Sequence, residues 1–196
     1  MPAKPKLRLS QDAEADKLLS ADPLALLIGM VLDQQIPLEW AFKGPHTLKS
    51  RLGHLNVADI AAMDPDELAA VFSKPPALHR FPAANAKRVQ EVCRIVVDEY
   101  KGKADRIWKS AKTGDELLRN VKALPGFGEQ KARIFVALLG KQLGITPPGW
   151  DDAAGDFGKP GTYMSVADIT DPDTLGRVRQ YKQERKAAAR PQPANG

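Results

Sequence analysis

Cysteine is nearly absent from this sequence of 196 residues, and histidine is scarce. The single cysteine, Cys93, excludes an intrachain disulfide, a four-cysteine zinc site and a cysteine-ligated iron–sulfur cluster made by this chain alone. The three histidines, His46, His54 and His79, are scattered and lack the spacing of metal ligands. We therefore expect neither a metal nor another cofactor.

Long hydrophobic runs are also missing, and aromatic residues make up only 6% of the chain. No apolar run approaches the roughly 18 residues that a membrane span needs. Residues 1–8 lack the apolar segment of a signal peptide. These absences predict a cytoplasmic protein that does not enter a membrane.

The net charge of +5 is concentrated at the two ends of the chain. From residue 176 onward there are six basic residues and one acidic residue, and residues 1–8 add three more basic ones. The part between Leu9 and Leu175 carries 20 basic and 23 acidic residues. A uniformly basic DNA-coating protein is thereby excluded, so any contact with nucleic acid must come from local patches, backbone groups or the tail.

Helix signals recur along the sequence. Asp22, Asp64 and Asp171 each precede a proline, which is typical of an N-cap followed by the first helical position. Thr113 begins a capping box with Glu116. Apolar residues recur at helical spacing after these signals, and no stretch alternates with period two. The sequence predicts an all-α fold of about eight to ten helices.

Proline and glycine mark the expected domain organisation. Residues 146–163 contain three prolines and four glycines and predict an irregular loop with at most a few turns. We expect residues 1–8 to form a flexible basic arm, residues 9–176 the helical domain, and residues 177–196 a basic tail that passes from helical to disordered.

A turn with two glycines separates two predicted helices at residues 124–128, Leu-Pro-Gly-Phe-Gly. Glycine permits a tight turn with positive φ, and the amides at the start of the second helix can hold a phosphate. Lys122, Lys131 and Arg133 would add positive charge there. The alternative is a helical corner that serves only packing.

The longer string Leu-Pro-Gly-Phe-Gly-Glu-Gln-Lys-Ala (residues 124–132) resembles the helix-hairpin-helix motif of the HhH-GPD family of DNA glycosylases, with the hairpin at residues 115–143. Residues 27–35 are similar to that family's first core helix, and residues 84–89 to the start of its long middle helix. The three blocks keep the family's order and spacing. The resemblance implies a helical bundle with a cleft between two sub-domains.

The resemblance also implies which residues contact DNA. They are Gly126, Phe127, Gly128, Gln130, Lys131, Lys122, Gln35, Gln34, Arg80 and Lys87. Without the resemblance, the two glutamines would be polar residues that close a buried helix, and Lys87 would lie on a solvated helix start. Near Arg80, either Leu78 or Phe81 would fill the gap left by a flipped nucleotide, unless Phe81 packs on the following helix.

In the family, an aspartate about 20 residues past the hairpin stabilises the cationic transition state or activates water. Asp151 and Asp152 follow Gly128 by 23 and 24 residues, so the resemblance implies that they are catalytic. The alternative is a helix cap or a loop acid, because the chain after them departs from the family's pattern; Asp156 is a third candidate. Trp150 beside them either stacks on a base or anchors the loop.

Family members that also nick the DNA backbone use a lysine two residues after the second hairpin glycine as an amine nucleophile. Gln130 occupies that position here. Lys131 follows by one residue, which turns it by about 100° around the helix and away from the nucleophile's place. The sequence therefore predicts a monofunctional enzyme without lyase activity.

Three functions are compatible with these observations. The first is a monofunctional DNA glycosylase of base excision repair that hydrolyses the N-glycosidic bond of a damaged or mispaired base. The second is a non-catalytic helix-hairpin-helix protein that recognises distorted DNA. The third, a helical interaction protein, must treat three ordered blocks as coincidence. We expect a monomer that binds double-stranded DNA and is associated with the nucleoid when bound.

Overall fold

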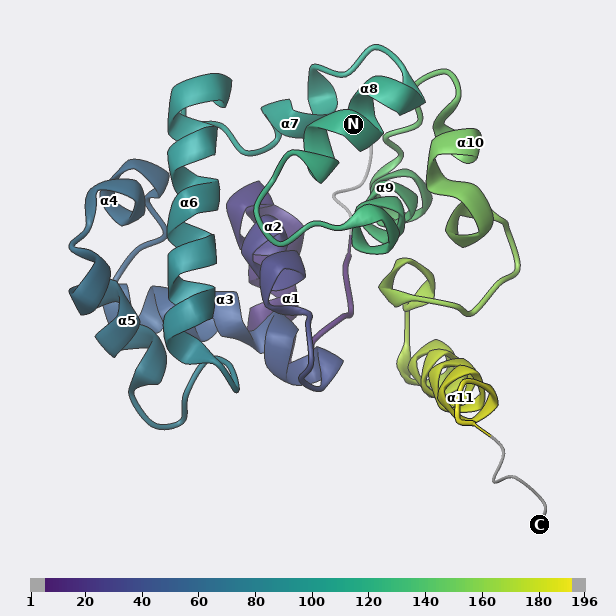
Figure 1. Cartoon of the computed structure of the whole chain (residues 1–196), viewed down its shortest axis with the longest axis horizontal. Helices are drawn as coiled ribbons and strands as arrows, with labels where there is room; N and C mark the ends of the chain where they lie inside the picture. Colours follow the sequence, from purple (N-terminus) through teal and green to yellow (C-terminus); the bar gives the residue numbers. More distant parts are fainter. Residues whose placement is uncertain (1–5, 192–196) are drawn as a thin grey trace.

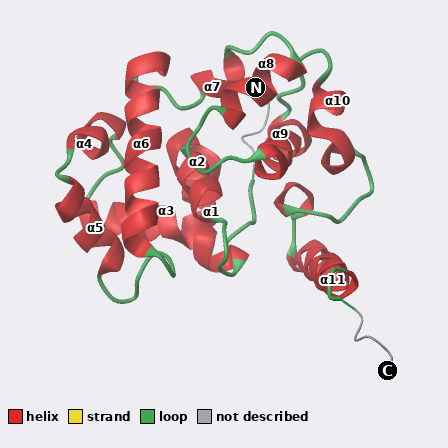
Figure 2. Cartoon of the chain, in the orientation of Figure 1, coloured by secondary structure: helices red, strands yellow, loops and turns green. Residues whose placement is uncertain are grey.

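The structure is a computed structural model that describes residues 6–191, and within this range it contains helices and turns but no strand (Figure 2). The elements in order are α1 (Ala13–Ala21), α2 (Pro23–Leu32), α3 (Leu38–Leu52), α4 (Val57–Ala62), α5 (Pro65–Ser73), α6 (Pro82–Tyr100), α7 (Arg106–Lys109), α8 (Gly114–Lys122), α9 (Glu129–Leu143), α10 (Trp150–Ala154), the 3-10 turns η1 (Gly155–Gly158) and η2 (Val166–Asp168), and α11 (Pro172–Ala188). The all-α prediction is confirmed. The helices of this part slightly exceed the expected eight to ten because elements as short as α7 and α10 give little periodic signal.

Local capping explains where four of the helices begin. The Asp22 side chain accepts from the Leu24 N–H, and the Asp64 side chain from the N–H groups of residues 66 and 67. Thr113 Oγ1 accepts from the Glu116 N–H at 3.1 Å, and Asp171 forms a capping box with Thr174. These bonds satisfy amide groups that have no partner inside the helix, so α2, α5, α8 and α11 start where the sequence predicts.

The buried helix α2 lies at the centre of the molecule, and its residues from Leu24 to Leu32 are all buried. Helices α1, α3 and α6 pack around it, while α4 and α5 cover the outer side of α6 (Figure 1). A second group forms around α9, which contacts α8 and α10. The C-terminal end of α2 therefore faces the second group across the middle of the molecule.

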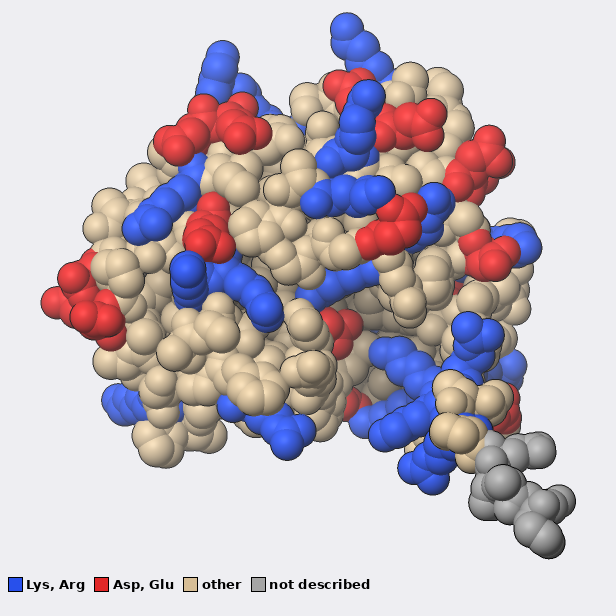
Figure 3. Space-filling view, viewed as in Figure 1, with Lys and Arg blue, Asp and Glu red and all other residues tan. Residues whose placement is uncertain are grey.

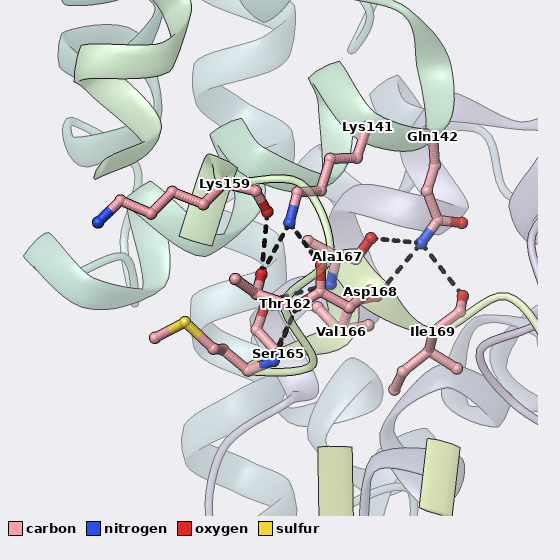
Figure 4. A network of polar contacts seen from close by, with 10 residues as sticks. Lys141, Gln142, Lys159, Thr162, Ser165, Val166, Ala167, Asp168 and Ile169 are labelled. Carbon is pink, nitrogen blue, oxygen red and sulfur yellow. Dashed lines mark hydrogen bonds and ion pairs between the residues drawn. The ribbon is translucent and has the colours of Figure 1, made fainter. Parts of the chain in front are cut away.

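A polar network holds the segment that leads into α11 (Figure 4). Lys141, near the end of α9, pairs with Asp168 Oδ1 at 2.5 Å, and the Asp168 side chain is only 4% exposed. Gln142 Nε2 donates to the carbonyl oxygens of Val166, Ala167 and Ile169 at 2.9–3.3 Å. Because α11 starts a few residues later, this network holds the segment from which the basic helix begins.

The two ends of the chain differ in part from the expectation. Residues 1–5 and 192–196, at the ends of the predicted arm and tail, lie outside the described residues. Leu7, within the expected flexible arm, is 3% exposed, and its N–H donates to Ser20 Oγ at 2.9 Å. Helix α11 runs on to Ala188, across the expected boundary at residue 176. Between residues 6 and 191, none of the helices combines the length and apolar character of a membrane span.

Trp150 anchors the irregular segment 146–163, which is one of the two roles predicted for it. Its indole Nε1 donates to the Val136 carbonyl at 2.7 Å. The ring lies against Gly140, where an added Cβ would come within 2.1 Å of the indole. Glycine at position 140 therefore allows α10 to pack closely on α9, and Trp150 is occupied in this contact rather than free to stack on a base.

We predict that Trp150→Ala lowers the free energy of unfolding by about 3 kcal/mol, because it removes a large aromatic side chain from a packed contact. Trp150→Phe, which keeps a ring and loses the hydrogen bond, should cost about 1 kcal/mol. Urea unfolding measures both effects. Unchanged stability together with weakened binding of damaged DNA would instead assign Trp150 to base stacking.

Candidate functional site

A cleft of about 570 Å³ opens where the C-terminal end of α2 meets the N-terminal end of α9. Its lining residues are Met30, Asp33, Gln34, Gln35, Ile36, Gly126, Gly128, Glu129, Gln130, Lys131, Ile134 and Lys182. Six residues that the sequence analysis singled out therefore lie together, although nearly a hundred positions separate the glutamines from the hairpin. Lys182 comes from α11, and several basic side chains of this helix lie beside the hollow in the surface (Figure 3).

The chain leaves α2 through an irregular turn that presents the glutamines. The Gln34 N–H donates to the Leu32 carbonyl at 2.7 Å, and Gln35 has a left-handed backbone with φ of 60°. This conformation is uncommon for a residue other than glycine and is enriched at functional sites. Gln34 Oε1 accepts from Arg88 Nη1 at 3.4 Å, which links the turn to α6, whereas Gln35 is exposed.

The hairpin turn uses its two glycines differently. Gly126 has φ of 85° and requires glycine, but Gly128 has φ of −75° and ψ of 179°, which any residue can adopt. The expectation of positive φ therefore holds only for Gly126. A Cβ added at Gly128 would meet nothing within 4 Å, so the space in front of Gly128 is open. The Phe127 side chain is buried against Phe135, with ring centroids 5.9 Å apart, so only its backbone can face DNA.

The start of α9 has the properties of an anion site. Gly128 is its N-cap, and no side chain caps this helix. The first amides of an α-helix have no partner within the helix and lie at the positive end of its dipole. With the open space at Gly128, these amides can bind a phosphate oxygen directly.

The positive charges expected near the hairpin are engaged within the protein. Lys122 pairs with Glu129, which also binds Arg133 at 2.8 Å. Lys131 Nζ donates to the Val31 carbonyl at 3.0 Å and lies 5.4 Å from the centroid of the Phe127 ring. Attraction for phosphate at the turn consequently comes from amides more than from these side chains.

Lys131 lines the cleft, and that its position on the helix turns it away from the nucleophile's place stays a prediction. A lysine side chain is long enough to extend back across the end of α2, where it finds an unpaired carbonyl. Burial lowers the pKa of Lys131 to about 8; the charge of Asp33 acts against this shift, and that of Arg88 adds to it.

Asp33 lines the same cleft, although it is not among the site residues predicted from the sequence. Burial raises the pKa of the Asp33 carboxyl, while the charges of Lys182 and Lys131 act in the opposite direction. Within residues 6–191 its carboxylate makes neither a hydrogen bond nor an ion pair. A carboxylate is unfavourable at a helix C-terminus. An aspartate at the C-terminal end of a helix, directly before the two glutamines, is the sequence pattern that could have indicated Asp33.

The structure does not bring Asp151 and Asp152 to the cleft. Both are exposed on α10, which packs against α8 and α9. Arg133 Nη1 donates to the carbonyls of Asp152 and Ala153, at 3.3 and 2.8 Å. The Trp150 anchor holds α10 in this place. Asp156 is also exposed and pairs with Lys159 at 2.6 Å.

The loop before α6 presents an exposed aromatic ring beside an arginine. Phe81 is 48% exposed, and the Arg80 guanidinium lies 5.7 Å from its ring centroid. Leu78 is buried, so it cannot fill a gap in DNA, and Phe81 does not pack into the core. Lys87 is exposed on the first turns of α6.

His79 ties this loop to the glutamine turn. The Phe81 N–H donates to His79 Nδ1 at 2.9 Å, so the ring proton sits on Nε2, which donates to the Gln34 carbonyl at 2.7 Å. Asn85 Nδ2 lies 2.9 Å from Nδ1 as well. The pKa of His79 is lowered, above all by burial, although its bond to Gln34 acts in the other direction.

Helices α8 and α9, joined by the turn at residues 124–128, form a helix-hairpin-helix arrangement beside the cleft. The model of the HhH-GPD superfamily of base excision DNA repair proteins matches residues 28–192, so the chain belongs to this family. A search of curated proteins finds no significant match.

Several solved structures are similar to this chain at low identity. One is endonuclease III in a non-covalent complex with DNA, with 18% identity, a TM-score of 0.44, and coverage of 88% of this chain and 94% of that chain. Another is the H. pylori 3-methyladenine DNA glycosylase MagIII bound to 1,N6-ethenoadenine, with 17% identity, a TM-score of 0.48 and the same coverage. A thermostable thymine-DNA glycosylase shows 15% identity and a TM-score of 0.42, and the match covers 89% of this chain and 77% of that chain.

Because the folded state lowers the pKa of His79 below its ordinary value of 6.5, the unfolded chain binds this proton more readily. We predict that this contribution to stability is complete above pH 6.5 and is lost as the pH falls. His79→Gln should therefore show a smaller drop in free energy of unfolding between pH 7.5 and pH 5.5 than the wild type. Urea unfolding at both values, with His54→Gln as the control, measures this. Equal drops in wild type and His79→Gln would contradict the lowered pKa.

Proposed function

We propose that the chain is a monofunctional DNA glycosylase that removes a damaged or mispaired base from double-stranded DNA. Its family membership places it among base excision repair proteins. The observation that carries the proposal is the cleft that joins the glutamine turn to an uncapped helix start. The helix start that would bind a phosphate therefore also lines the cleft that would hold a nucleotide.

DNA bound in this way would meet three features of the protein. A phosphate would approach the α9 amides through the open space at Gly128. Phe81 and Arg80 would enter the base stack from the loop that His79 holds beside Gln34. The flipped nucleotide would enter the cleft, whose volume of about 570 Å³ lies within the range of small-molecule pockets.

The absence of lyase activity is the finer part of this proposal. Gln130, at the position of the nucleophilic lysine, has no basic amine. The neighbouring Lys131 amine donates to the Val31 carbonyl and contacts the Phe127 ring. These contacts engage the amine in packing rather than in nucleophilic attack. We therefore assign hydrolysis, with water as the nucleophile, to this site.

A second function is favoured by the position of α10. Asp151 and Asp152 lie outside the cleft, so a protein that depended on them for catalysis would only bind DNA. That protein would use the same hairpin and loop to recognise distorted DNA. Excision of any base separates the two functions.

We predict that Gly128→Val weakens binding to duplex DNA by roughly tenfold, or ~1.4 kcal/mol, because the side chain occupies the space through which a phosphate approaches. The backbone at Gly128 does not require glycine, so the free energy of unfolding should fall by no more than about 1 kcal/mol, the cost of a poorer N-cap residue. Fluorescence anisotropy at several salt concentrations measures the affinity, which should fall as salt rises. Wild-type affinity in folded Gly128→Val would contradict the hairpin assignment.

We also predict that any excision leaves abasic sites and no direct strand break. Products would be separated on a gel with and without alkali, which cleaves abasic sites. Borohydride should trap no covalent adduct between the protein and DNA, since trapping requires a Schiff base. An adduct that disappears in Lys131→Gln would show that Lys131 is a nucleophile and that the enzyme is bifunctional.

A further inference from the structure

Two acidic side chains line the cleft, and they differ in whether they are already engaged. Glu129 is 51% exposed and paired with both Lys122 and Arg133. The carboxylate of Asp33 has no such partner in the part of the chain that the structure describes. We propose that Asp33 is the catalytic carboxylate of this site, an assignment that rests on the proposed function as a glycosylase.

Positive charges from two other elements surround Asp33 without forming a direct ion pair. Lys131 belongs to α9 and Lys182 to α11, and both line the cleft. The pair between Arg179 and Glu39 holds α11 against the segment that follows the glutamine turn. Burial raises the pKa of the Asp33 carboxyl, and the charges of Lys131 and Lys182 oppose that rise. Because no group among residues 6–191 binds the Asp33 carboxylate, it can accept a hydrogen bond from a water molecule or a sugar.

Asp33 also occupies a suitable place relative to the features that would hold DNA. It directly precedes Gln34, whose carbonyl accepts from His79 in the loop that carries Phe81. Across the cleft lie Gly128 and the first amides of α9. A nucleotide flipped between the loop and the hairpin would therefore bring its sugar to the wall that Asp33 forms.

The chemistry at this position is hydrolysis of one bond. The bond between C1′ of the sugar and the base nitrogen breaks, and its electron pair leaves with the base. The oxygen of a water molecule bonds to C1′ while Asp33 accepts one proton from that water. A proton from solvent neutralises the base nitrogen, and Asp33 later returns its proton to solvent. The products are a free base and an abasic sugar with a hydroxyl group at C1′.

The test is excision under single-turnover conditions on a panel of alkylated, oxidised, deaminated and mispaired bases in duplex DNA. Asp33→Asn should slow the excision of the best substrate by a factor on the order of 10² to 10⁴, which is the usual contribution of a general base. Its affinity for the same DNA should be kept or increased, because a negative charge is removed near phosphates. Asp98→Asn, an exposed substitution on α6, is the matched control and should excise at the wild-type rate.

A stability measurement separates catalysis from a structural role. If Asp33 merely held the cleft together, Asp33→Asn would lower the free energy of unfolding. A carboxylate kept for catalysis in a partly buried position at a helix C-terminus should instead leave the variant as stable as the wild type, or more stable. Asp33→Ser provides a second neutral variant, and it should be folded and equally slow. Slow excision that accompanies loss of stability in both variants would overturn the assignment.

The failures of the two proposals are distinguishable. If the wild type excises a base and folded Asp33→Asn does so at the same rate, the glycosylase function stands and the assignment of Asp33 falls. Loss of excision in Asp151→Asn or Asp152→Asn, but not in Asp33→Asn, would return the catalytic role to α10. If the wild type excises nothing across the panel while it still binds DNA, both proposals fail and the non-catalytic function replaces them.

Discussion

The hydrogen bond from the Lys131 ammonium to the Val31 carbonyl joins the two halves of this molecule at the point where function is concentrated. Helix α2 ends with carbonyls that have no partner within the helix, and α9 begins with amides in the same condition. Lys131 satisfies one of those carbonyls from the first turn of α9, so the two helix ends are held facing each other. The glutamine turn, the hairpin and the cleft between them all depend on this arrangement.

This joint also explains how a chain with an acidic middle can present a surface for DNA. Lys122 and Arg133 neutralise Glu129, and Lys131 is committed to α2, so the hairpin carries little free positive charge. The amides of α9 attract phosphate because their dipoles point toward it, so no charged side chain is needed. Lys182 of α11 adds positive charge to the lining of the cleft, and the Lys141–Asp168 network holds the segment that leads into α11 (Figure 4).

The packing of α10 and of the end of α2 places their aspartates in different surroundings. On α10, Trp150 fastens its helix to α9 by filling the space beside Gly140, which leaves the two neighbouring aspartates in solvent. At the end of α2, Asp33 instead lines a cleft that Lys131 and Lys182 also line. The pKa of a carboxylate in water stays near its ordinary value, whereas burial and neighbouring charges shift the pKa of one in a partly buried cleft.

The sequence by itself determined most of the helices, because capping and periodicity act between residues a few positions apart. Asp22, Thr113 and Asp171 begin their helices as predicted, and the three ordered blocks were enough to indicate the family. Short helices such as α7 escaped prediction because four residues show no period. Tertiary structure alone decided which side chains share the cleft. Asp33, Lys131 and Lys182 come from three helices, and burial and charge at such a site arise from contacts between distant segments that no local pattern records.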